Sequence, residues 1–406
     1  MLETPKANRL HIAIFGRRNA GKSSLINALT NQDIALVSDV PGTTTDPVFK
    51  AMEILPIGPC MIIDTAGIDD VGTLGELRIK KTREVLNQTD LAILVLDSTI
   101  GVTEFEKELK AEISGKNIPI VGVVNKSDLG PVDIKEMEKS LGLSLVEVSS
   151  ATRSGIPKLK ERIINAAPFD FEEPYIVGDL VNPGEVCVLV VPIDLAAPKG
   201  RLILPQVQTI RDLLDNDAIS IVVKERELRE ALSKLKDKPK LVVTDSQAFL
   251  KVAADTPDNV WMTSFSILMA RFKGDLLELV RGAKAVETLK PGDKVLIAEA
   301  CTHHRQADDI GKTQIPRWLR QYVGGDLDFH FSSGTGYPEN LEDFKIIIHC
   351  GGCMINRRQM LYRIEMAKEK GVPIVNYGVF LAFVHGILDR ALEPFPLAML
   401  AFVEEE

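Results

Sequence analysis

The fold of this chain of 406 residues is decided by one stretch, Leu10-His-Ile-Ala-Ile-Phe-Gly16-Arg17-Arg18-Asn19-Ala20-Gly21-Lys22-Ser23-Ser24. An apolar run leads directly into G-x-x-x-x-G-K-S, and a helical segment follows, which is the context of a phosphate-binding loop. The glycines let backbone N–H groups converge on the phosphates. Lys22 then reaches the β- and γ-phosphates, and the Ser23 hydroxyl is placed to ligate Mg²⁺. The sequence therefore predicts a P-loop nucleotide-binding domain.

A second motif, Asn125-Lys126-Ser127-Asp128, predicts the base of the nucleotide. It follows the apolar run Ile120–Val124, which we expect to be a strand. A carboxylate such as Asp128 accepts from the N1–H and N2–H₂ donors of guanine, whereas adenine leaves a buried carboxylate unpaired. The sequence therefore predicts GTP rather than ATP.

A third motif, Asp64-Thr-Ala-Gly67, follows the apolar run Cys60–Ile63. The Asp64 carboxylate can hold Mg²⁺ through water, and the Gly67 N–H can contact the γ-phosphate. The three motifs all stand at the carboxyl ends of expected strands, where α/β sheets bind ligands. The next residue, Ile68, cannot orient an attacking water, so we expect GTP hydrolysis to be slow or assisted.

Between the first and third motifs, the segment Pro41-Gly-Thr43-Thr44-Thr45-Asp46 resembles the Pro-Gly-Thr-Thr-Arg-Asp segment of the TrmE and Era group of GTPases. Thr45 replaces the usual Arg. The resemblance implies that Thr44 is the Mg²⁺ ligand that senses the γ-phosphate, with Thr43 as the alternative. It also implies that Asn19 helps bind K⁺ in place of an arginine finger, although Asn19 can equally be a turn-forming residue.

The same resemblance covers residues 10–165, and Ser150 and Ala151 match the last guanine-contacting loop of the group. A GTPase of this type that acts on RNA needs a basic RNA-binding module. The chain has a net charge of -9 and shows no interleaving of aromatic and basic residues, so we expect no nucleic-acid partner.

Composition limits the remaining possibilities. The length predicts two to three domains of about 150 residues, and the apolar content of 45% supplies a core for each. No apolar run reaches the ~20 residues of a membrane span, and the first residues do not resemble a signal peptide. Five cysteines, an odd number, argue against a disulfide framework and for a reducing compartment. We therefore expect a cytoplasmic protein without a membrane partner.

We predict an α/β protein of three domains, a P-loop GTPase followed by two further parallel-sheet α/β domains. The acidic, proline-flanked segment Phe169–Pro174 predicts a linker, which gives a GTPase domain at 1–169. Alternating β-branched runs and amphipathic helices predict a structural or dimerisation domain at 175–264, with Cys187 in its core. Residues 264–285 are expected to form one long helix, and the third domain, which binds metal, covers 265–406.

Three cysteines in the last domain form a candidate metal site: Cys301, Cys350 and Cys353. Each of the two segments that carry them follows an expected strand, so a parallel sheet brings the segments to the same edge. Three thiolates favour a 4Fe-4S cluster with an open fourth iron position. A structural zinc is the alternative, with His303 or His349 as the fourth ligand. For the fourth iron the candidates are His303, His349 and Glu299.

The pattern Cys301-x-His303, 45 further residues, and His349-Cys350-x-x-Cys353, joined to a GTPase, resembles the HydF GTPases that mature FeFe-hydrogenase. The resemblance extends over essentially the whole chain. It implies a scaffold that binds a 4Fe-4S cluster, carries the di-iron subcluster precursor and delivers it to apo FeFe-hydrogenase. It also implies the radical-SAM hydrogenase maturases as partners, a homodimer or larger assembly, and GTP hydrolysis that gates partner exchange.

Overall fold

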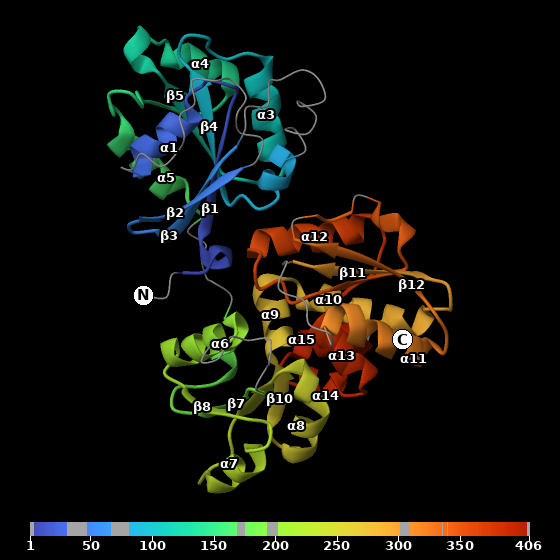
Figure 1. Cartoon of the computed structure of the whole chain (residues 1–406). Helices are drawn as coiled ribbons and strands as arrows, with labels where there is room; N and C mark the ends of the chain where they lie inside the picture. Colours follow the sequence, from blue (N-terminus) through green and yellow to red (C-terminus); the bar gives the residue numbers. More distant parts are fainter. Residues whose placement is uncertain are drawn as a thin grey trace. The chain divides into compact units, whose positions relative to one another are not determined.

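The computed structural model describes residues 4–30, 47–65, 81–168, 175–192, 202–300, 309–334, 336–338 and 340–403. The chain divides into two units, Met1–Phe171 and Glu172–Glu406. Figure 1 shows the sheets and helices of each unit. Short helical turns lie at η1 Lys6–Asn8, η2 Ser127–Leu129, η3 Gly178–Leu180, η4 Ser246–Ala248, η5 Ala285–Thr288, η6 Ile310–Gln314 and η7 Leu341–Asp343.

The first unit is built on a six-stranded sheet of order β2-β3-β1-β4-β5-β6, in which only the pairing of β2 with β3 is antiparallel. The strands are β1 Leu10–Phe15, β2 Val48–Ile54, β3 Gly58–Asp64, β4 Leu91–Asp97, β5 Ile120–Asn125 and β6 Leu145–Glu147. The described helices are α1 Lys22–Thr30, α3 Glu104–Gly115, α4 Ile134–Leu141 and α5 Ile156–Ala166.

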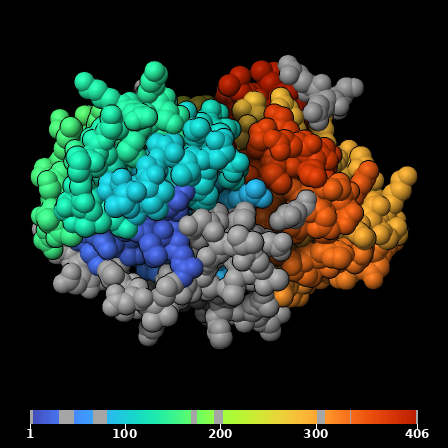
Figure 2. Space-filling view, turned by 90° about the horizontal axis from the view of Figure 1, so that it is seen from above, coloured from blue at the N-terminus to red at the C-terminus, as the bar shows by residue number. Residues whose placement is uncertain are grey.

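Helices cover both faces of this sheet. Ile12 and Ile14 of β1 pack in the core that α1 and α5 cover, while Ala13 and Phe15 pack in the core beneath α3 and α4. Every residue of β1 and β4 is buried, as expected for parallel strands covered on both faces. The outer sides of α3 and α4 contribute to the cyan and green surface in Figure 2. Because the helices cover the two faces, the loops that follow the strands lie at the carboxyl edge of the sheet.

The second unit contains two parallel four-stranded sheets, of order β10-β9-β7-β8 and β12-β11-β13-β14. The first has strands β7 Val186–Val190, β8 Ile219–Val223, β9 Leu241–Thr244 and β10 Trp261–Ser264. The second has β11 Lys294–Glu299, β12 Asp328–Ser333, β13 Ile346–His349 and β14 Ile374–Asn376. The helices are α6 Leu204–Asp215, α7 Leu228–Lys234, α8 Phe249–Asp255, α9 Phe265–Lys273, α10 Leu276–Lys284, α11 Ile315–Val323, α12 Arg357–Glu369, α13 Tyr377–Val384, α14 Leu388–Leu392 and α15 Pro396–Val403. The α/β prediction with further parallel sheets is confirmed.

One hydrophobic core extends through the second unit from Leu189 of β7 through Leu268 of α9 to Ile347 of β13. Cys187 lies in it and is fully buried, as predicted. The domain boundary that the sequence predicts between residues 264 and 265 stays a prediction. Within the described ranges, no helix is long and apolar enough to cross a membrane.

The prediction of a single helix over 264–285 is wrong. The chain forms α9 and then α10, and the break falls at Gly274 and Asp275. The Asp275 carboxylate accepts a hydrogen bond of 3.2 Å from the Glu278 N–H and so caps the second helix. This Gly-Asp pair is a stop signal followed by a start signal, and it is visible in the sequence.

Candidate nucleotide-binding and metal-binding sites

The phosphate-loop motif connects β1 to α1 at the carboxyl edge of the first sheet. Gly16 has φ +152°, and a Cβ there would lie 2.4 Å from the Val95 carbonyl oxygen. Gly21 has φ +86°, and a Cβ there would lie 2.3 Å from Nδ2 of Asn125. Asn19 has φ 60°, a left-handed conformation that asparagine tolerates better than most residues. The loop therefore requires glycine at both of its motif positions.

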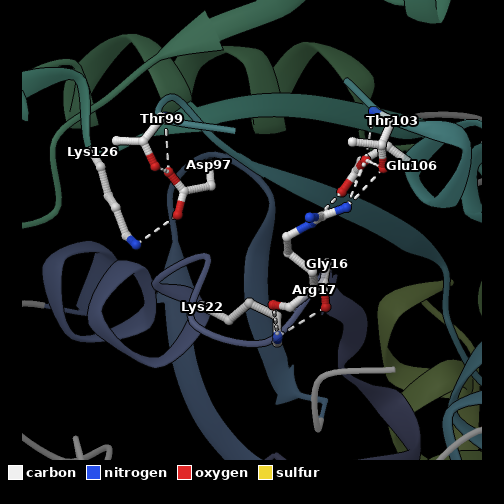
Figure 3. Close-up of polar contacts among 8 residues, drawn as sticks. All are labelled: Gly16, Arg17, Lys22, Asp97, Thr99, Thr103, Glu106 and Lys126. Carbon is white, nitrogen blue, oxygen red and sulfur yellow. Dashed lines mark hydrogen bonds and ion pairs between the residues drawn. The ribbon is translucent and has the colours of Figure 1, made fainter. Parts of the chain in front are cut away.

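Lys22 is buried, and its ammonium lies inside the loop (Figure 3). Its Nζ donates to the carbonyl oxygens of Gly16, at 2.9 Å, and Arg17, at 2.7 Å. Ser23 and Ser24 follow in the first turn of α1, whose N-terminal N–H groups favour an anion. The predicted phosphate-binding groups are therefore together in one loop.

The side chain of Arg17 is directed away from Lys22, toward the start of α3 (Figure 3). Its Nε donates to Oε1 of Glu106 at 2.8 Å, and its terminal nitrogen donates to the Thr103 hydroxyl at 2.8 Å. Glu106 is fully buried, and a carboxylate without water needs such partners. Sequence reasoning missed this contact because 89 residues separate Arg17 from Glu106 and no local pattern marks it.

The predicted Mg²⁺ ligands Ser23 and Asp64 are in direct contact. The Ser23 hydroxyl donates to Oδ2 of Asp64 at 2.6 Å. Oδ1 of Asp64 is buried and has no hydrogen-bond partner in the described part of the chain. Burial raises the pKa of this carboxyl, although the hydrogen bond from Ser23 and the charge of Lys22 oppose the shift. A hydroxyl and an unpaired carboxylate oxygen fit a hard cation such as Mg²⁺.

Three further predictions for this site lie outside the described residues: Thr44 with its alternative Thr43, Gly67, and Ile68.

The predicted guanine-contacting residues lie beside the phosphate loop. Asn125, at the end of β5, donates from Nδ2 to the Ala20 carbonyl at 2.9 Å. Its Oδ1 accepts from the Ser150 N–H at 3.1 Å and from the Ser150 hydroxyl at 2.9 Å. Asp128 accepts a 2.6 Å hydrogen bond from the Ser149 hydroxyl. The structure thus brings together the segments that contain Asn125 and Ser150, and Ala151 follows in the same turn.

Lys126 adopts φ 65° and points to the end of β4 (Figure 3). Its Nζ donates to Oδ2 of Asp97 at 2.6 Å, and the Thr99 hydroxyl donates to Oδ1 at 2.6 Å. Burial alone raises the pKa of Asp97, but the hydrogen bonds from Lys126 and Thr99 outweigh it and hold the pKa below its usual value. Sequence reasoning did not name Asp97, although its position at a strand's carboxyl end was a signal.

In the second unit, β11 and β13 are parallel neighbours, with Ala298 opposite His349. The Cys350 N–H donates to the Ala298 carbonyl at 2.9 Å, and the Ala300 N–H lies 3.1 Å from Sγ of Cys350. The predicted neighbouring strands are therefore observed, and Cys350 lies at their carboxyl edge. Cys301, which directly follows Ala300 in sequence, and His303 lie outside the described residues.

The cysteine loop, defined here as residues 350–355, encloses a lysine that sequence reasoning missed. The Lys273 side chain is only 2% exposed. Its Nζ donates to the carbonyl oxygens of Gly352, Cys353 and Ile355 at 3.3, 3.0 and 3.1 Å. Burial lowers the pKa of Lys273 to about 8, and the nearby Cys353 and Cys350 oppose the shift.

His349 is fully buried, and both of its ring nitrogens are engaged. Nε2 lies 2.8 Å from a terminal nitrogen of Arg363, and Nδ1 lies 2.6 Å from the Cys350 carbonyl oxygen. Because arginine can only donate, Nε2 accepts and the protonated Nδ1 donates. Burial and the Arg363 charge lower the pKa of His349 to about 3. This arrangement leaves no ring nitrogen for a metal.

Glu299, the last residue of β11, is buried at the same edge. The Tyr377 hydroxyl donates to its Oε1 at 3.4 Å. Burial, together with nearby Cys350 and Glu299, raises the pKa of Tyr377 well above its usual value. Among the residues described, no three His, Cys, Asp or Glu side chains form a complete metal site.

Three family models match the chain. Residues 11–126 match the model described as 50S ribosome-binding GTPase. Residues 176–274 match the Hydrogen maturase F dimerization domain, and residues 277–394 match the Hydrogen maturase F tetramerization domain. The last two models together cover more than half of the chain, and the boundary between them falls at the break between α9 and α10.

Curated relatives match over a shorter length. The tRNA modification GTPase MnmE of Desulforamulus reducens is 37% identical over 160 residues, which are 38% of this chain and 34% of the relative. MnmE of Thermoanaerobacter sp. is 41% identical over 160 residues with the same shares. The chain thus spans about a third of the length of these relatives.

Two solved structures are similar to parts of the chain. The G domain of the T. maritima FeoB protein is 28% identical, covers 39% of this chain and 99% of its own, and gives a TM-score of 0.31. Aquifex aeolicus Era bound to GDP and AlF4- is 17% identical, covers 89% of this chain and 98% of its own, and gives a TM-score of 0.36.

Proposed function

Because the chain belongs to the HydF family, we propose that it is a GTP-hydrolysing scaffold for hydrogenase maturation. In this proposal it binds a 4Fe-4S cluster, carries the di-iron subcluster precursor and delivers it to apo FeFe-hydrogenase. One structural observation supports this proposal in addition to the family match. Cys350 lies at the shared carboxyl edge of β11 and β13, beside the segment that leads into Cys301, in a chain that also contains a P-loop.

For GTP hydrolysis we assign the phosphate contacts to Lys22 and the loop N–H groups. The ammonium exchanges the Gly16 and Arg17 carbonyls for phosphate oxygens when GTP binds. Ser23 and Asp64 hold Mg²⁺, which neutralises the charge on the phosphates. We further propose slow hydrolysis that K⁺ stimulates through Asn19, whose left-handed backbone lies in the phosphate loop.

For the cluster we propose thiolate ligands from Cys301, Cys350 and Cys353. The Ala300 N–H beside the Cys350 sulfur suits such a ligand, because N–H groups stabilise the charge on a thiolate. His349 is engaged at both nitrogens, so we assign the fourth position to His303 or Glu299. An exchangeable fourth ligand suits a carrier.

We also propose a homodimer or larger assembly, since the two matched models carry dimerization and tetramerization in their names. The radical-SAM hydrogenase maturases are the proposed source of the di-iron precursor. The proposed location is the cytoplasm, where thiols stay reduced.

A second candidate is an RNA-associated GTPase with a structural zinc. It is favoured by the MnmE relatives and by the ribosome-binding description of the model over residues 11–126. Those likenesses do not account for the two models that match the second unit. The net charge of -9 also disfavours an RNA partner.

The experiment is anaerobic reconstitution with iron and sulfide, followed by activation of apo-hydrogenase. We expect the purified chain to gain the visible absorbance of a cluster and, once loaded with the di-iron precursor, to activate hydrogenase. Cys350→Ser should lose most of the iron and all activation, because a hydroxyl is a poor ligand for iron. The control is Cys187→Ala, in the core of the other sheet. One tightly bound zinc without iron uptake contradicts the proposal and supports the second candidate.

A further inference from the structure

The end of α9 and the start of α12 are joined by hydrogen bonds in both directions. Lys273, the last residue of α9, donates to three carbonyl oxygens of the cysteine loop. Arg357, the first residue of α12, donates in return to the carbonyl oxygens of Phe272, at 2.6 Å, and Gly274, at 3.4 Å. Carbonyls left open at the end of α9 are thus satisfied by the first residue of α12, while the last residue of α9 binds the loop that precedes α12.

The surroundings of the Lys273 Nζ suit an ammonium. An ammonium has three N–H bonds, and three carbonyl acceptors are within hydrogen-bond distance. This ammonium is almost completely buried, and its three acceptors are neutral carbonyls. One of these acceptors is the backbone carbonyl of Cys353, so the ammonium lies within the loop that carries both Cys350 and Cys353. A buried cation is costly without an anion, and an anionic metal group held by this loop would supply one.

We infer that Lys273 is the positioning residue of the cysteine loop and the counter-charge of the metal group that this loop holds. The inference rests on the proposed function, because it takes Cys350 and Cys353 as thiolate ligands. Three hydrogen bonds fix the loop backbone before metal arrives, so less order has to be created on binding. The positive charge then stabilises an anionic cluster and favours its reduced form, which raises the reduction potential.

The position of Lys273 adds a connection between the two halves of the second unit. Lys273 belongs to the residues matched by the dimerization model, and its three acceptors belong to the residues matched by the tetramerization model. These hydrogen bonds therefore join residues matched by one model to residues matched by the other.

The test uses the full chain with Lys273→Met, which keeps the apolar stem and removes the charge, and with Lys273→Arg, which keeps the charge. Lys284→Met is the matched control, since Lys284 ends α10 in the same way but lies 5.5 Å over the Phe402 ring. After anaerobic reconstitution, the reduction potential and the rate of iron loss to a chelator are measured. We expect Lys273→Met to lower the potential and to lose iron at least about 10-fold faster. Lys273→Arg should recover most of the potential, and Lys284→Met should match the unmodified chain.

A second readout needs no cluster. In metal-free protein, the amide hydrogens of residues 350–355 should exchange at least about 10-fold faster in Lys273→Met, while those of β7 keep their rates. If the unmodified chain takes up no iron, both the proposed function and the counter-charge role are wrong. The hydrogen-exchange experiment tests the positioning role even in that case. Unchanged exchange in Lys273→Met overturns that role. A folded Lys273→Met that holds its cluster at an unchanged potential overturns the counter-charge.

Discussion

The Ser23 hydroxyl donates a hydrogen bond of 2.6 Å to Oδ2 of Asp64, which joins the start of α1 to the end of β3. The other carboxylate oxygen is buried and has no partner among the described residues. A carboxylate in this setting is unfavourable by itself and becomes favourable when a cation arrives. The contact therefore has consequences for catalysis and for stability that can be measured separately.

The first prediction concerns catalysis. Asp64→Asn should reduce Mg²⁺-dependent GTP hydrolysis by about 10²-fold or more, because the amide carries no charge to hold the cation. Iron uptake should be unchanged, since Asp64 belongs to the other unit. Phosphate release and iron content measured on the same preparation test both statements. Loss of iron in this variant contradicts the modular assignment.

The second prediction concerns stability without nucleotide or Mg²⁺. Burial raises the pKa of Asp64 in the folded chain, so this group stabilises the fold at low pH and loses that contribution as pH rises through the folded pKa. Asp64→Asn should therefore melt at a higher temperature than the unmodified chain at pH 7, and the gap should narrow as pH falls toward about 4. In a unit of this size, each ~1 kcal/mol corresponds to an increase of about 2–4 °C. A lower melting temperature for the variant at pH 7 contradicts the assignment.

A third prediction tests the base. Asp128→Asn should weaken GTP binding at least about 10-fold and strengthen binding of xanthosine triphosphate, because the amide donor no longer complements the guanine N1–H. Fluorescence titration with GTP and with xanthosine triphosphate measures both affinities. Glu136→Gln, on the exposed side of α4, is the control. Unaltered GTP affinity in Asp128→Asn means that Asp128 does not contact the base.

The cation gives a fourth prediction. Replacing K⁺ by Na⁺ should slow hydrolysis in the unmodified chain, and Asn19→Ala should remove the difference, because the K⁺ charge stabilises the transition state. Asn19→Gly separates the alternatives, since it keeps the left-handed turn and deletes the side chain. Retention of K⁺ stimulation in Asn19→Gly identifies Asn19 as a turn-forming residue only.

Much of the fold could be predicted because its signals are local. The apolar run before Gly16 and the run before Asn125 each ended in a motif, and parallel strands bring such ends to one edge. The same reasoning predicted that the strands before Cys301 and Cys350 lie together, and β11 and β13 are neighbours. The prediction of a single helix over 264–285 was wrong because the apolar residues keep a helical period across Gly274, although Gly274 ends α9 and Asp275 caps α10.

The contacts that hold the sites in place could not be predicted in the same way. Arg17 meets Glu106 across 89 residues, and Lys273 meets Cys353 across 80. A lysine or arginine in an amphipathic segment has the pattern of a solvated residue, and only the tertiary structure reveals that Lys273 is buried. His349 is the converse case, since its position beside Cys350 favours a ligand while Arg363 occupies its Nε2.

The last prediction concerns His349, whose Nε2 is occupied by Arg363. His349→Gln should keep the iron content and the electron paramagnetic resonance spectrum of the reduced cluster. The Nε2 of His349 accepts a hydrogen bond from Arg363 and its Nδ1–H donates to the Cys350 carbonyl oxygen, so neither nitrogen offers a lone pair to a metal. His303→Gln and Glu299→Gln are the informative comparisons, and the variant that removes the fourth ligand should alter the spectrum or its exchange with added imidazole. All three should keep their iron, since the three proposed cysteine ligands are unchanged in each variant. A spectrum altered by His349→Gln alone, with those of His303→Gln and Glu299→Gln unchanged, means that His349 leaves Arg363 when the cluster binds.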